Sequence, residues 1–262
     1  MLRYLSRAAL LTAALGLGLT PNAGRSADEK GAWGTVKGRV VFGGGDVPAP
    51  VTLNVDKDQQ HCLKDGPILS EEWVINKDNK GIANAFIWLA PAKGAAPLPI
   101  HASLKDIRDK EVVMDQPCCK FEPHALAMRE GQILVARNSA PIAHNTHWTG
   151  HPLKNPGGNI IVPAKQEHKI TDLKADRFPV KINCDIHPWM SAYVRVYDHP
   201  YFAVTDKDGK FELKLAPEGT WRLIGWHEKT GWVFTGPEEL ANGKPITIKA
   251  GGETDFGKIE LK

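Results

Sequence analysis

Short runs of alternating apolar and polar residues make up most of this 262-residue chain, and they end at glycine, proline or Asp-Gly turns. A period of two places successive side chains on opposite faces of an extended chain, so each run predicts a β-strand. Asp206-Lys207-Asp208-Gly209 is the strongest turn signal between two runs. We expect strands over residues 35–42, 84–89, 132–137, 178–183, 192–197, 202–205, 210–215, 221–226, 246–248 and 256–261.

The fold class predicted by this pattern is all-β. No long amphipathic helix, repeat array or transmembrane span stands out in the sequence. The 25 glycines and 19 prolines suit many short strands and turns better than helices. Residues 91–99, rich in proline, alanine and glycine, are expected to form a loop or linker.

The first 27 residues predict a secretory signal peptide. Arg3 and Arg7 precede an apolar run from residue 8 to residue 19, and small residues follow it. The run is short for a membrane span, so cleavage between Ala23 and Ala27 is favoured over a retained anchor. We therefore expect a periplasmic, secreted or cell-surface protein without stable membrane insertion.

Loss of this segment changes the charge balance. It removes three of the 33 basic residues and no acidic one, which leaves 30 basic and 30 acidic side chains. The formal charge then falls from +3 to zero. Because no basic cluster interleaved with aromatic residues is present, the sequence argues against nucleic acid as a partner.

Four side chains from two distant stretches form the candidate chemistry. Cys184, His187 and Met190 follow one another at intervals of three residues, and His144 lies forty residues upstream of the cysteine. A thiolate, two imidazoles and a weak axial thioether are the ligand set of type 1 copper sites. We therefore predict one copper ion at these four residues. Cys184 must bind as a thiolate, so a nearby cation is expected to lower its pKa.

Other interpretations of these residues stay open. Cys184 and Met190 could be core residues, with His187 on the surface, or the site could take another metal. His147 is a competing ligand, although the solvent-facing side of a strand is the expected place for it. His124 either serves a second metal or has a structural role.

His199 and His227 could meet in space, but burial beside aromatic side chains is the simpler expectation. A second metal at His124 would take its other ligand from Cys119.

The motifs around these ligands resemble the cupredoxin family, the amicyanin- and plastocyanin-like blue copper domains. The short Cys-x-x-His-Pro-aromatic-Met loop is most similar to that of amicyanins, which also carry a His-Asn-x-His-aromatic stretch like that of residues 144–148. The resemblance covers about residues 111–198 and implies an eight-stranded Greek-key sandwich with copper at one end. It also implies that Asn145 hydrogen-bonds near the thiolate and ties the two ligand loops together.

The sequence departs from that family at the adjacent Cys118 and Cys119. An exported protein tolerates disulfides, and a bridge between neighbouring cysteines is strained. Cys62 is therefore expected to pair with Cys118 or Cys119. One of these three cysteines should remain free.

The resemblance also suggests a docking surface. Pro188, Trp189 and Ala192 would surround an exposed edge of His187, where a redox partner could approach the metal. In the alternative, Trp189 packs inward.

The flanking segments resemble the carboxypeptidase regulatory-like (transthyretin-like) β-sandwich. Gly34, Val36, Gly38 and Val40 match its opening strand, and residues 204–223 match two later strands and their turns. We expect residues 31–100 and 199–262 to form one discontinuous sandwich, with the cupredoxin domain at 108–198 inserted between them. Three consecutive small domains are the alternative.

The predicted function is the transfer of single electrons between redox proteins, for which a c-type cytochrome or a dehydrogenase is a candidate partner. No motif for a catalytic serine, a zinc protease or a phosphate-binding loop is present, so an enzyme is not expected. A copper carrier or store is one alternative. A structural or adhesion sandwich with an incidental metal site is another.

Overall fold

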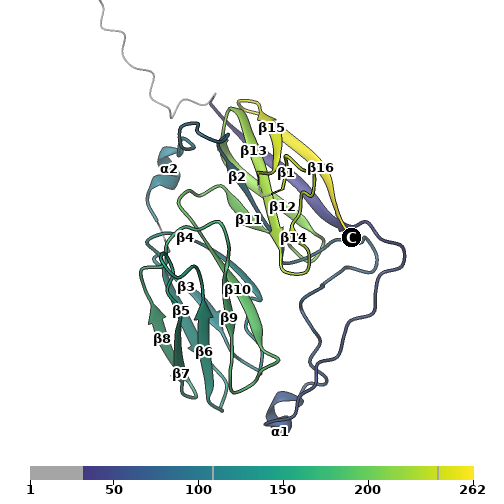
Figure 1. Ribbon diagram of the computed structural model, residues 1–262, viewed down its shortest axis with the longest axis vertical. Helices are drawn as coiled ribbons and strands as arrows, with labels where there is room; N and C mark the ends of the chain where they lie inside the picture. The colour runs from purple at the N-terminus through teal and green to yellow at the C-terminus, as the bar shows by residue number, and fades with distance from the viewer. Residues whose placement is uncertain (1–31, 108, 241) are drawn as a thin grey trace, which may run out of the picture.

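Residues 32–107, 109–240 and 242–262 are described by the computed structural model, and they consist mainly of strands and loops (Figure 1). The all-β fold class expected from the sequence is therefore confirmed. The two helices in these ranges are short, α1 (Gln59–Cys62) and α2 (Ala102–Lys105). No helix in these ranges is long and apolar enough to cross a membrane. The expected signal peptide, residues 1–27, lies outside the described residues.

The first sandwich combines strands from both ends of the chain. One sheet has the order β12-β1-β16, and the other has the order β11-β2-β13-β14, with β15 beside β13. β1 is antiparallel to β12 and parallel to β16, while β2 is antiparallel to β11 and β13. The strands are β1 (Trp33–Phe42), β2 (Phe86–Ala90), β11 (Phe202–Val204), β12 (Lys210–Pro217), β13 (Gly219–His227), β14 (Gly231–Trp232), β15 (Lys244–Ile248) and β16 (Glu253–Leu261).

Alternation along β1 explains why this sandwich closes. Val36 and Val40 are fully buried and belong to a core that also holds Leu213 of β12 and Leu223 of β13. Strands on the two sides of residues 91–201 therefore pair with one another. The domain boundaries at 31–100, 108–198 and 199–262 stay predictions.

The turn at residues 206–209 also forms as predicted. Gly209 has φ +73°, and a Cβ there would lie 2.0 Å from the Val40 carbonyl oxygen, so the position requires glycine.

The second sandwich has eight strands between Glu111 and Tyr197. Its sheets have the orders β4-β10-β9-β6-β7 and β3-β5-β8. Apolar side chains from both sheets meet in one core, which gives the layers their buried faces. The strands are β3 (Glu111–Asp115), β4 (Ala125–Arg129), β5 (Ile133–Asn138), β6 (His144–Thr149), β7 (Gly158–Val162), β8 (Gln166–Ile170), β9 (Val180–Asn183) and β10 (Ser191–Tyr197).

An aromatic cluster joins the two sandwiches. Phe86 and Trp88 of β2 pack with Tyr197 of β10 and Ile224 of β13. The guanidinium of the buried Arg195 lies 3.8 Å from the centre of the Trp88 ring, within the range of a cation–π contact. The two sandwiches therefore share buried surface.

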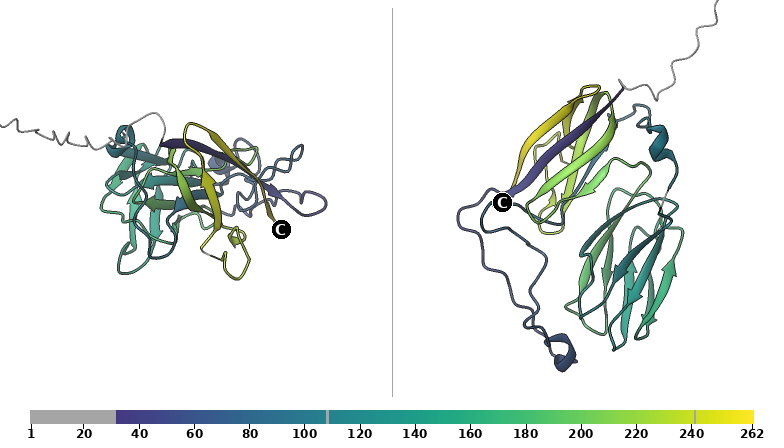
Figure 2. Two further views of the ribbon diagram at one scale, coloured as in Figure 1. Left: turned by 90° about the horizontal axis from the view of Figure 1, so that it is seen from above. Right: turned by 180° about the vertical axis from the view of Figure 1, so that it is seen from behind.

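A long segment between β1 and β2 reaches from the first sandwich to the second. We call residues 46–72 the strap. Figure 2 shows it leaving the end of β1 and running toward α1. Its two arms are joined by a backbone bridge between Thr52 and Leu69, while Val55 and Cys62 are buried in the core of the second sandwich. The tip of the strap is therefore held in the core of the second sandwich.

Candidate metal centre

Strand register brings the two ligand stretches together. β6 and β9 are antiparallel neighbours, with His147 opposite Asn183. His144 precedes His147 by three residues, and the ligand loop begins directly after Asn183. Because neighbouring strands run in opposite directions, the start of β6 lies beside the loop that joins β9 to β10. His144 therefore reaches Cys184 and His187.

The three side chains converge in a buried space. Nδ1 of His144 lies 2.9 Å from Nδ1 of His187, and Sγ of Cys184 lies 3.9 Å from Nδ1 of His187. Ligand atoms of all three residues lie within 4.8 Å of one another, and each residue is at most 1% exposed. Bonds of roughly 2.0 Å from nitrogen and 2.3 Å from sulfur to one ion can span these separations. The donor set therefore fits one soft or borderline metal ion.

Met190 is placed beside this cluster by its backbone. Its N–H donates to the His187 carbonyl at 2.9 Å, and its own carbonyl accepts from the Cys184 N–H at 3.3 Å. The loop thus folds back on itself, and the Met190 side chain is buried in the same core as Cys184. Its role as the fourth, axial ligand stays a prediction.

Asn145 ties the two ligand stretches together, as expected from the sequence. Its Oδ1 accepts from the backbone N–H groups of Asp185 at 2.6 Å and Ile186 at 3.0 Å. Its backbone N–H points to Sγ of Cys184 at 3.5 Å. Nδ2 donates to Oδ1 of Asn159 at 2.8 Å, so the amide is held from both sides. These bonds orient the ligand loop before any ion arrives.

Burial keeps the imidazole of His144 in its neutral form. Burial, and then the neighbouring His187 and His61, lower the pKa of His144 to about 4. Its imidazole is therefore neutral at neutral pH, which is the form that binds a metal.

The expectation of a cation that lowers the pKa of Cys184 is wrong. Burial raises the pKa of this thiol, and backbone hydrogen bonds, with Asn145 first, oppose that effect only in part. Among the described residues that act on this pKa there is no cationic side chain. The positive charge that favours a thiolate would have to come from the metal itself.

The structure settles which of the other three cysteines are paired. Cys62 and Cys119 form a disulfide, one of the two expected pairings, and Cys118 is a free thiol. Cys62, Cys119 and His187 also lie close enough to suggest a metal group. Because two of its sulfurs are bonded to each other, this group is not a ligand set in the oxidised protein.

The disulfide also removes Cys119 as a ligand partner for His124, so the second metal site considered there is wrong in this state. His124 is buried instead between two carboxylates. Its Nε2 contacts Glu228, and its Nδ1 lies 3.8 Å from Glu71.

The other histidines have local partners. His147 is half-buried, and its Nδ1 lies 3.1 Å from Oδ1 of Asp185, on the outer side of the ligand loop. His199 packs on Tyr197, and His227 packs on Trp73. Aromatic packing of the last two agrees with the simpler expectation for them.

The exposed edge expected for His187 is wrong. The side chain is 0% exposed, and its Nε2 lies 2.8 Å from Oδ2 of Asp58 on the strap. Of the expected collar, Pro188 is exposed, but Ala192 is buried and Trp189 is half-buried.

The Trp189 indole donates to the Cys119 carbonyl at 3.2 Å. The inward-packing alternative therefore describes this tryptophan better.

Sequence reasoning missed Asp58. The residue lies 129 positions before His187 in a segment without strand periodicity. An aspartate just before a short run of polar residues is common in loops, so no motif could have identified it.

Comparison with solved structures finds amicyanins. An oxidized amicyanin variant is 22% identical, covers 35% of this chain and 87% of its own, and gives a TM-score of 0.31. A reduced amicyanin variant is 21% identical, covers 44% of this chain and 99% of its own, also with a TM-score of 0.31. A Cu(I) form of another amicyanin variant is 20% identical, covers 44% of this chain and 99% of its own, and gives a TM-score of 0.31. No protein-family profile matches the chain, and no curated protein matches it.

Proposed function

We propose that this protein is an exported type 1 copper protein that carries single electrons between redox partner proteins. The observation that carries the proposal is the buried convergence of two imidazole nitrogens and one thiol sulfur within 4.8 Å of one another. Copper bound there would supply one-electron redox chemistry through its Cu(II) and Cu(I) states. His144, Cys184 and His187 would be its equatorial ligands and Met190 its axial ligand.

The surrounding chain prepares this site in three ways. Asn145 fixes the backbone of the ligand loop, burial keeps His144 neutral, and the apolar core excludes water. A rigid and dry ligand set needs little rearrangement when the charge of the site changes, which favours fast electron transfer.

The partners belong to the same proposal. A c-type cytochrome or a dehydrogenase is a candidate electron donor or acceptor, and no nucleic acid is expected. The periplasm or the cell exterior is the proposed location, in agreement with the Cys62–Cys119 disulfide. The protein is proposed to be an electron carrier and not an enzyme.

The test is the spectrum of the purified, copper-loaded chain. We expect intense visible absorption from thiolate-to-copper charge transfer, a narrow EPR hyperfine splitting and a reversible one-electron wave. Cys184→Ser should abolish the visible band. Cys118→Ser, which removes the free thiol outside the cluster, and His168→Ala on the exposed face of β8 should keep it.

A colourless protein with bound copper would contradict the type 1 assignment. Stoichiometric copper without a reversible wave would favour the carrier or store instead. Absence of copper binding would leave a structural sandwich.

A further inference from the structure

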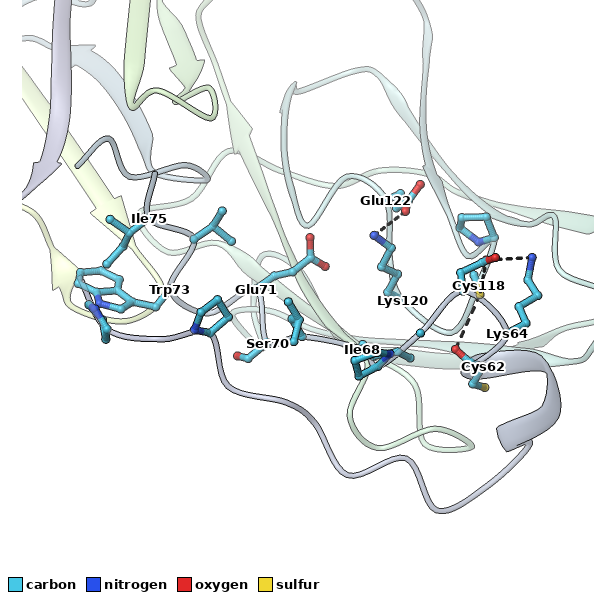
Figure 3. Close-up of a pocket in the computed structure, with 18 of the residues that line it drawn as sticks. Cys62, Lys64, Ile68, Ser70, Glu71, Trp73, Ile75, Cys118, Lys120 and Glu122 are labelled. Atoms are coloured by element: carbon cyan, nitrogen blue, oxygen red, sulfur yellow. Dashed lines mark hydrogen bonds and ion pairs between the residues drawn. The ribbon is translucent and has the colours of Figure 1, made fainter. Parts of the chain in front are cut away.

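The tip of the strap lies against the outer edge of the candidate copper site. Cys62, at the end of α1, is bonded to Cys119, and both sulfurs lie within 4.8 Å of a His187 ring nitrogen. Figure 3 shows Cys62 and Lys64 of the strap beside Cys118 of the second sandwich, where Sγ of Cys118 lies 4.0 Å from the Cys62 carbonyl oxygen. The disulfide therefore fixes the strap next to His187.

Asp58 adopts a backbone conformation that frees its carboxylate. It precedes α1 with φ 48° and ψ 33°, and its carbonyl accepts from the N–H groups of His61 and Cys62. An aspartate at this position normally caps the helix with its side chain. Here the side chain makes no cap and contacts Nε2 of His187 at 2.8 Å instead.

Besides accepting a hydrogen bond, the Asp58 side chain shields His187 from solvent. The Asp58 side chain is 39% exposed while His187 is 0% exposed, so the carboxylate stands between the ring and the solvent. His187 Nδ1 faces His144, which leaves Nε2 as the nitrogen that carries the proton when Nδ1 binds a metal. A carboxylate that accepts from this N–H fixes the tautomer and the orientation of the ring.

We propose that Asp58 is a positioning residue of the copper site, held against His187 Nε2 by the strap and its Cys62–Cys119 latch. This inference rests on the proposed function. The carboxylate adds negative charge beside the site, so it stabilises Cu(II) more than Cu(I). The reduction potential is therefore set in part by a side chain from outside the second sandwich.

The experiment compares full-length, copper-loaded variants by Cu(II) affinity, reduction potential and EPR. Asp58→Ala should weaken Cu(II) binding by roughly 10- to 100-fold. Each tenfold preference lost for Cu(II) over Cu(I) raises the reduction potential by about 59 mV. Asp58→Asn keeps an acceptor oxygen, so the EPR spectrum should return toward wild type while the potential stays high.

The role of the Cys62–Cys119 disulfide is tested by removing it with and without a substitution of Asp58. Cys62→Ala/Cys119→Ala should change the potential in the same direction, because the carboxylate is no longer delivered to the ring. Adding Asp58→Ala to that double variant should change nothing further, since both act through one contact. Asp56→Asn is the matched control: it removes an exposed carboxylate from the same strap and should leave the potential unchanged.

Two results would overturn the inference. One is an Asp58→Ala protein with bound copper and a wild-type affinity and potential. The other needs no metal: NMR of the metal-free protein should show a slowly exchanging Nε2–H on His187 that disappears in Asp58→Ala, and its absence from the wild type would refute the contact. A wild-type protein that shows this signal but binds no copper would instead contradict the proposed function alone.

Discussion

The two sandwiches bury different kinds of side chain. The core of the first holds apolar side chains from strands at both ends of the chain, such as Val36 and Leu223. Of the 11 buried polar or charged residues in the described ranges, nine lie between Gln116 and Arg195 in the second sandwich. Burial of a polar group costs free energy unless it has a partner. The polar residues that could form a site are therefore concentrated in the second sandwich, whereas apolar packing dominates the core of the first.

The strap runs from the first sandwich to the second. Removal of its disulfide should have the largest effect on the free energy of unfolding. Cys62→Ala/Cys119→Ala opens a loop with a sequence separation of 57 and should cost roughly 4 kcal/mol by the chain-entropy account. The free energy of unfolding from urea titration measures it. Cys118→Ser is the control and should leave the transition in place. An unchanged transition in the double variant would mean that the strap is held by its other contacts.

A large-to-small substitution in the core of the first sandwich tests whether this sandwich influences the copper site. Leu223→Ala removes a side chain that is 0% exposed and should cost roughly 3 kcal/mol. The visible copper spectrum should stay that of wild type, because the substitution leaves the ligand loop intact. A spectral change would show that the two sandwiches are coupled more tightly than their separate cores suggest.

The buried His227 makes the first sandwich sensitive to acid. Burial lowers its pKa from 6.5 to about 4, so the unfolded chain takes up a proton that the folded chain does not. The contribution of His227 to stability is therefore full above pH 6.5 and is lost as pH falls toward 4, by at most about 3 kcal/mol. Urea titrations of the metal-free protein against pH should show this loss, and His227→Gln should reduce it without abolishing it, because burial also lowers the pKa values of His144 and His199 to about 4. Equal acid sensitivity in both proteins would contradict the assignment.

Asn145→Ala should have the smallest effect on stability and a large one on the site. It leaves the N–H groups of Asp185 and Ile186 without their acceptor, at a cost of about 1–3 kcal/mol. The copper EPR hyperfine splitting should widen because the ligand loop loosens. Leu223→Ala is expected to behave differently, with a loss of stability and an unchanged copper spectrum. If both variants changed the spectrum alike, the two sandwiches would not differ in this respect.

Strands with an alternating pattern or a short apolar run could be predicted from the sequence, as for β1 and for the almost fully buried β2. β1 and β12 alternate clearly because one side of each packs into the first core. β8 was not predicted, since four of its five residues are exposed and it lacks an apolar stripe. β6 was not predicted either, because its buried positions hold His144, Asn145 and Thr146, whose polarity serves the site and hides the period.

The candidate ligands Cys184, His187 and Met190 could be predicted from the sequence because they lie within seven consecutive residues, and such spacing survives in any fold that contains the loop. The partner of His187 could not. Asp58 arrives from 129 residues away by way of a strap, a disulfide and an unusual backbone angle. The spacing of residues within one loop can be read along the chain, whereas a contact between distant segments forms only once the whole chain has packed.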